Sequence, residues 1–144
     1  MAARSASRRT LRSARRKPAC RWRCAARPQP FPPPDARFRP GAALEGGIVA
    51  VEAPRYAQLT EALVKLAATS VELVEIAGND DVLVTVIAPD AAAPPAGSFT
   101  LFTEALDDRP GWRRSGIAVK VPRLLAAIRE ARAAGIEIEH VYDY

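Results

Sequence analysis

Carboxylates are the residues in this chain that could do acid–base or metal chemistry. Glu137, Glu139 and Asp143 are separated by two and four residues, so a strand would place them on one face. Glu72 and Glu75 lie on a second segment with strand character. Paired carboxylates can bind a hard cation or act as general acid and base. The simpler interpretation is a solvated acidic sheet face, and no motif favours the catalytic one.

His140 is the only histidine of the chain. It alternates with Ile136, Ile138 and Tyr142, and this pattern predicts that its ring points into the core. A catalytic histidine needs a nucleophile or an orienting carboxylate directed at it, and no motif supplies one. The sequence also lacks a glycine-rich phosphate loop, a nucleophile elbow and a metal-ligand cluster. We therefore predict a protein that is not an enzyme and that holds no metal or cofactor.

Three arginines around a tryptophan form the candidate binding site. Arg109, Arg113 and Arg114 flank Trp112 in a predicted loop between two strands. Arginine with tryptophan suits an anionic ligand or a protein interface. In the alternative, structural interpretation, the tryptophan folds back over the sheet edge and the arginines pair with the two aspartates that precede Arg109.

Apolar periodicity predicts the elements that position these residues. Tyr56, Leu59, Leu63 and Leu66 recur at helical spacing, which predicts a first helix that begins at Pro54 and ends near Ser70. A second helix begins at Pro122, with Gly135 as its C-terminal cap. Runs rich in β-branched residues predict six strands, at 48–51, 71–76, 82–87, 98–106, 117–121 and 136–142.

The order of these elements predicts an α+β fold. We expect a two-layer, ferredoxin-like sandwich, with a mainly antiparallel sheet and two helices on one face. Turn residues 78–81 predict a hairpin between strands 71–76 and 82–87. The strand at 82–87 is almost wholly apolar, so we place it at the sheet centre. The last strand-helix-strand unit should be a right-handed crossover joining parallel strands.

Residues 119–142 resemble the strand-helix-strand unit of ACT-type regulatory domains. The resemblance rests on Val119–Pro122, on the apolar helix that follows, and above all on the ending Ala134-Gly135-Ile136-Glu137-Ile138-Glu139-His140-Val141-Tyr142. It implies a ferredoxin-like fold, pairing of subunits and amino-acid binding. ACT domains often carry a Pro-Gly between their first strand and helix, whereas here Pro110-Gly111 precedes the strand. No ACT ligand residue therefore transfers to a matching position.

Charge divides the chain into a basic leader (residues 1–45) and a mildly acidic domain (residues 48–144). The leader carries twelve Lys and Arg against two acids, and residues 46–144 carry nine against fourteen. Ala, Arg, Pro and Gly make up 29 of the 45 leader residues. A segment so poor in large aliphatic side chains cannot offset its ordering entropy. We therefore predict a disordered N-terminal segment.

Three origins for the leader stay open. It could be an arm for nucleic acid or a membrane surface, because Arg21-Trp22-Arg23 mixes charge with an aromatic ring. It could be an organelle transit peptide, because it is rich in Arg and poor in acids. It could also be translated GC-rich upstream DNA, with the true start at Val49 or Val51. A twin-arginine export signal is excluded, because no apolar segment follows Arg8-Arg9.

The function that fits these observations is a small non-enzymatic binding or regulatory module, which senses a small ligand or associates with itself or another protein. One alternative is a nucleic-acid-associated protein that uses the basic leader, and another is an enzyme with an unrecognised acidic site. The only cysteines, Cys20 and Cys24, lack the further ligands that zinc needs. No segment has the apolar length of a membrane span, so we expect a cytoplasmic protein with no membrane partner.

Overall fold

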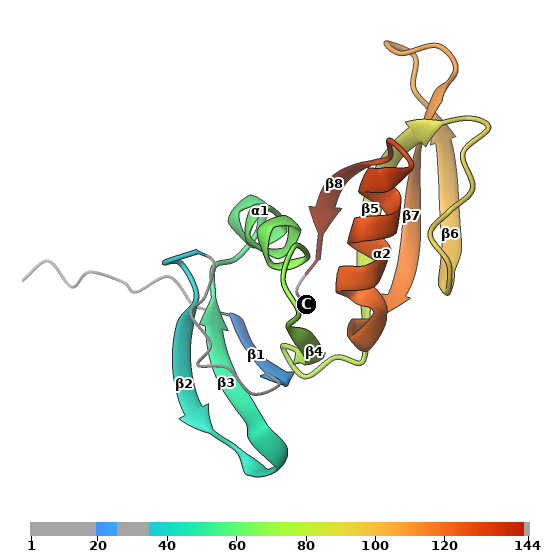
Figure 1. The fold of residues 1–144 in the computed structure, drawn as a ribbon. Coiled ribbons are helices and arrows are strands. Elements are labelled where there is room, and N and C mark those ends of the chain that lie inside the picture. Colours follow the sequence, from blue (N-terminus) through green and yellow to red (C-terminus); the bar gives the residue numbers. More distant parts are fainter. Residues whose placement is uncertain (1–19, 26–34, 143–144) are drawn as a thin grey trace, which may run out of the picture.

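The computed structural model describes residues 20–25 and 35–142, which fold into two sheets and two helices (Figure 1). In chain order the elements are β1 (Cys20–Ala25), β2 (Arg39–Ala43), the short 3-10 helix η1 (Glu45–Gly47), β3 (Ile48–Ala53), α1 (Ala57–Leu66), β4 (Glu72–Ile76), β5 (Asp81–Pro89), β6 (Ser98–Ala105), β7 (Trp112–Lys120), α2 (Val121–Ala133) and β8 (Glu137–Val141).

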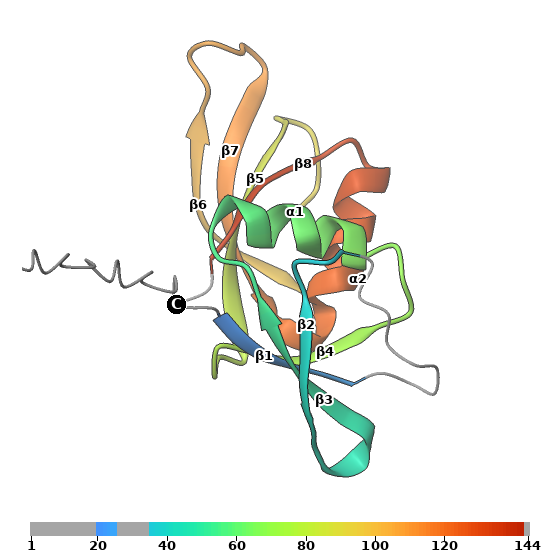
Figure 2. The same ribbon diagram turned by 90° about the vertical axis from the view of Figure 1, so that its left-hand side faces the viewer.

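The strands form two antiparallel sheets. Sheet A has the order β2-β3-β1-β4, and sheet B has the order β6-β7-β5-β8. Each hydrogen-bonded pair of strands is antiparallel. The helices join the sheets, because α2 contacts β7 and β8 of sheet B and also β4 of sheet A, while α1 contacts β8 (Figures 1 and 2). The buried apolar side chains form one core that both sheets share.

The α+β class and the mainly antiparallel pairing are confirmed. A ferredoxin-like sandwich is not confirmed, because the strands belong to two sheets of four. The predicted hairpin between 71–76 and 82–87 is wrong. Here β4 pairs with β1, and β5 lies between β7 and β8, so β5 has no free edge for β4. Ala77 and Gly78, both with positive φ, carry the chain from one sheet to the other.

The central position of β5 is confirmed, and so is the cap of α2. Val82, Val84 and Val86 of β5 are buried. The α2 helix ends in a Schellman motif, in which the Gly135 amide donates to the Arg132 carbonyl and the Ile136 amide to the Ala131 carbonyl. Since β7 and β8 are both antiparallel to β5, they run parallel to each other with β5 between them.

The first helix is shorter than its apolar pattern predicts. It begins at Ala57 and not at Pro54, and it ends at Leu66. Tyr56 precedes the helix with φ 59°, so its side chain leaves the apolar face and is 68% exposed. The face of α1 that enters the core carries Leu59, Thr60, Ala62, Leu63 and Leu66.

Two strands, β1 and β2, lie in the part of the leader that the structure describes, where the sequence predicted none. The strand β1 pairs with β3 and β4, and β2 pairs with β3. Phe38 is 2% exposed and belongs to the shared core. A few large apolar residues therefore suffice to pack this segment against the domain, because the domain supplies the surface that buries them. The rest of the predicted disordered segment, 1–19 and 26–34, lies outside the described residues.

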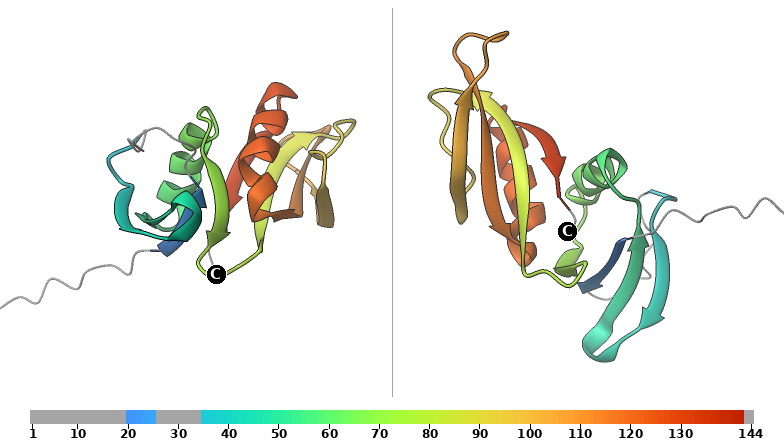
Figure 3. Two further views of the ribbon diagram at one scale, coloured as in Figure 1. Left: turned by 60° about the horizontal axis from the view of Figure 1, so that its bottom comes forward. Right: turned by 180° about the vertical axis from the view of Figure 1, so that it is seen from behind.

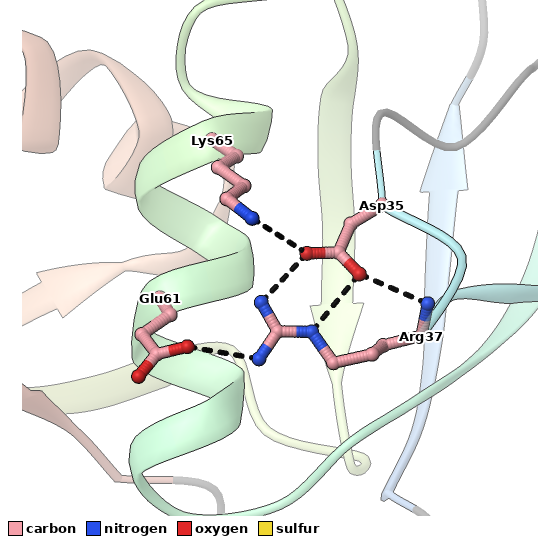
Figure 4. Close-up of polar contacts among 4 residues, drawn as sticks. All are labelled: Asp35, Arg37, Glu61 and Lys65. Carbon is pink, nitrogen blue, oxygen red and sulfur yellow. Dashed lines mark hydrogen bonds and ion pairs between the residues drawn. The ribbon is translucent and has the colours of Figure 1, made fainter.

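An ion-pair network holds the end of the leader against α1 (Figure 4). Arg37 Nη2 lies 2.6 Å from Asp35 Oδ2, and Arg37 Nη1 lies 2.9 Å from Glu61 Oε2. Lys65 Nζ approaches the same Asp35 oxygen at 3.2 Å. Hydrogen bonds from Arg37 hold the pKa of the Asp35 carboxyl well below its usual range. Both helix residues lie on the exposed side of α1, so the contact fixes the segment that leads into Phe38.

Sheet B has one face covered by α2 and one face that α2 leaves uncovered. The covered face carries Val84 and Val86 of β5, with Ile117 and Val119 of β7. The uncovered face, which we call the open face, carries the alternate residues of each strand; it faces the viewer in the right-hand view of Figure 3. In the described part of the chain, neither helix is both long and apolar enough to cross a membrane.

Candidate functional site

Three of the four candidate binding residues, Trp112, Arg113 and Arg114, begin β7, and Arg109 lies in the loop before it. The predicted loop ends earlier than expected, because β7 already begins at Trp112. The turn is closed by hydrogen bonds from the Trp112 amide to the Arg109 carbonyl and from the Leu106 amide to the Trp112 carbonyl. Strand geometry then directs Arg113 and Arg114 to opposite faces of sheet B.

Arg109 covers the indole ring of Trp112. Its guanidinium carbon lies 3.4 Å from the ring centroid, which is a cation–π contact. The Nη1 atom of the same arginine lies 2.9 Å from Glu137 Oε1 on β8. The arginine therefore connects the tryptophan to the acidic strand, and Trp112 is half-buried beneath it.

Arg114 pairs with Glu139, two strands away across β5. Its Nε atom donates to both carboxylate oxygens, at 3.0 and 2.8 Å, and Nη2 donates to Oε1 at 2.7 Å. The hydrogen bonds from Arg114 lower the pKa of Glu139, and partial burial opposes them. The hydrogen bonds to Glu139 likewise raise the pKa of Arg114. This geometry is the two-pronged arrangement that makes arginine–carboxylate pairs strong.

Arg113 lies on the other face and binds backbone. Its Nη1 donates to the Asp90 carbonyl, and its Nη2 donates to the Ala92 carbonyl at 2.8 Å. Both carbonyls belong to the connection between β5 and β6. Because β5 and β6 run parallel, this connection has to return along the sheet, and Arg113 holds its first half in place.

The arginine group and the acidic strand thus neutralise each other. Sequence reasoning treated them as two separate candidates, and its alternative interpretation paired the arginines with Asp107 and Asp108. In the structure Arg109 pairs with Glu137 and Arg114 pairs with Glu139 instead. Among the described residues, no group of three His, Cys, Asp or Glu could hold a metal ion. The third acidic candidate, Asp143, lies outside the described residues.

His140 does not point into the core as predicted. It pairs with Thr85 on the open face of sheet B, whereas Ile138 pairs with Val86 on the covered face. A bulge between these two pairs makes Glu139 the extra residue and breaks the alternation. The His140 ring is half-buried and meets the Tyr142 ring edge-on, with 4.5 Å between centroids.

The structure adds a candidate that sequence reasoning missed, the strand β6. Residues 99–105 are all exposed, and the large apolar side chains among them are Phe99, Leu101 and Phe102, at 70%, 54% and 40% exposure. A bulge at Leu101 brings Phe99 and Phe102 to the open face, where the Phe102 ring lies over Gly116. The signal in the sequence was a strand that is apolar on both sides, with Glu104 as its only charge.

Two small hollows lie beside the β5–β6 connection, over the covered face of sheet B. They have volumes of about 40 and 180 Å³, and Pro94 and Ile136 line both. In comparisons with known proteins, the chain matches no family model, no curated protein and no solved structure.

Proposed function

We propose that this protein is a small non-enzymatic binding module that recognises another protein chain through strand β6. One observation carries the proposal: β6 is an eight-residue edge strand that exposes three large apolar side chains. An exposed edge strand offers a row of backbone donors and acceptors to a partner strand. Its apolar side chains add the contacts that stabilise such pairing.

The other three sheet edges support the proposal by contrast, because each is protected. The edge of β2 carries Arg39, Pro40 and a bulge, which all discourage pairing. The edge of β4 lies against α2. At the edge of β8, the Val141 amide donates to Thr60 Oγ1 of α1 at 2.9 Å. Within residues 20–25 and 35–142, no element pairs with the outer edge of β6.

A protein partner fits this surface better than a small ligand does. The larger hollow, of about 180 Å³, is smaller than the roughly 300–1,000 Å³ of typical ligand pockets. Arg109 and Arg114 are already paired with carboxylates. An anionic ligand would have to displace those carboxylates to bind the arginines. The regulatory, ACT-like interpretation stays a proposal that rests on residues 119–142. The nucleic-acid interpretation rests on the leader and predicts salt-dependent binding that is lost with residues 1–45.

Site-specific photocrosslinking in cells that make the protein tests the proposal. A photoreactive residue at Leu101 should form covalent adducts with a protein partner. The matched control is the same residue at Val74, an apolar position of β4 that is 37% exposed. Equal adduct yields at the two positions, or no adduct at Leu101, would overturn the proposal.

A further inference from the structure

We infer that the partner of β6 is a second copy of the same chain. This inference rests on the proposed function, since it names the occupant of the surface proposed there. In this dimer, β6 pairs antiparallel with β6 of the second molecule around a two-fold axis. The two copies of sheet B then form one continuous sheet of eight strands.

The edges of sheet B explain why such an association stops at two molecules. Among the residues that the structure describes, the edges of this sheet are β6 and β8. The edge of β8 is closed by α1, through the buried hydrogen bond between Val141 and Thr60. A molecule with one open edge can pair once, whereas a molecule with two would extend into a fibre. Self-pairing of β6 is therefore closed and isologous.

The charge of β6 favours the antiparallel direction. Glu104 is the only charged residue of the strand and lies next to its C-terminal end. Antiparallel pairing places the two Glu104 side chains at opposite ends of the interface. Parallel pairing would place them side by side, and directly opposed like charges destabilise a sheet. The remaining residues are apolar or carry neutral hydroxyl groups, so neither copy contributes a buried charge.

The exposed apolar area predicts a weak dimer. From their exposed fractions, Phe99, Leu101 and Phe102 offer roughly 300 Å² per molecule, on the scale of about 150–250 Å² for a whole aromatic side chain. A standard interface buries roughly 800 Å² per partner. The backbone hydrogen bonds of the paired strands add to the side-chain term. We therefore expect a dimer that dissociates on dilution.

Light scattering and sedimentation of the full chain across a dilution series test the inference. The wild type should change from twice the monomer mass to the monomer mass as it is diluted. Leu101→Lys places a charge at the centre of the pairing and should raise the dissociation constant at least about tenfold, which is about 1.4 kcal/mol. Val74→Lys, on an edge that β6 does not contact, should dimerise like the wild type. Circular dichroism checks that both variants fold.

The outcomes separate this inference from the proposed function. A monomer at every concentration, a dimer that Leu101→Lys leaves intact, or an open-ended series of larger species would each overturn the inference. Crosslinking at Leu101 then decides the proposed function by itself. An adduct with a different protein would support the proposal that β6 binds a partner. The absence of any adduct would overturn that proposal.

Discussion

Arg114 on β7 and Glu139 on β8 form a two-pronged ion pair that spans the central strand of sheet B. Three nitrogen–oxygen distances of 2.7 to 3.0 Å join the two side chains. The pair links two strands that are not neighbours, because β5 lies between them. The bulge that displaces His140 from the covered face also makes Glu139 the unpaired extra residue of β8. One backbone irregularity thus positions the carboxylate that Arg114 binds.

Glu139→Gln should make the stability of the protein less sensitive to acid. Arg114 lowers the pKa of Glu139 below its ordinary value of 4.5 in the folded state. A carboxyl with a lowered folded pKa stabilises the fold fully above its unfolded pKa, and this contribution is lost as the pH falls through the folded pKa. We expect urea denaturation of the wild type to show a steeper loss of stability on acidification than the variant shows.

Arg114→Ala provides the second arm of this test. The two single variants and the double variant form a cycle that isolates the pair from other effects of each substitution. If the double variant is as destabilised as the sum of the two single variants, the ion pair contributes nothing to stability.

Phe38→Ala should destabilise the fold by about 3–5 kcal/mol, as expected for removal of a buried aromatic side chain. Phe38 is 2% exposed and lies in the core that sheets A and B share. The control is Leu44→Ala, because Leu44 is 39% exposed on the same segment and should change stability by less than about 0.5 kcal/mol. Equal effects of the two substitutions would mean that residues 35–45 do not belong to the folded domain.

The sequence was sufficient where the residues of a segment decide its place by themselves. The cap at Gly135 and the central strand β5 follow from local chemistry and from an unbroken apolar run. The predicted hairpin was wrong because the turn at 78–81 does not reveal which edges of β5 other strands occupy. Disorder of the leader was inferred from composition, which does not show that the domain offers a place for Phe38.

Prediction of the candidate site was limited in the same way, because its contacts join residues that are far apart in the sequence. The sequence placed the arginines near Trp112, but their partners Glu137 and Glu139 lie 28 and 25 residues away. The pattern of 98–106 predicted a strand but not its irregularity, since a bulge at Leu101 leaves no mark in the spacing of apolar residues. Whether a strand lies at an edge depends on the whole sheet and not on its own residues.

Gly116→Ala should destabilise the fold by about 1–3 kcal/mol through overpacking. A Cβ atom at this position would lie 2.1 Å from Cε1 of the Phe102 ring, so the ring must turn away. Phe102 is partly exposed and has room to move, which keeps the cost within this range. The double variant Gly116→Ala/Phe102→Ala should lose less stability than the sum of the losses in the two single variants. Strict additivity in thermal unfolding would show that the ring does not rest on Gly116.

Thr60→Val should cost about 1–3 kcal/mol, because it leaves a buried amide without a hydrogen-bond acceptor. Thr60 is 6% exposed, and its hydroxyl accepts the Val141 amide at 2.9 Å. Valine keeps the volume of the side chain, so the loss reports the hydrogen bond and not a cavity. Thr60→Ser retains the acceptor and should lose only the methyl contribution, about 0.8 kcal/mol. Amide exchange at Val141 should accelerate in Thr60→Val and not in Thr60→Ser. The same rate in both variants would mean that α1 does not close the β8 edge through this bond, and sheet B would then have a second edge available for pairing.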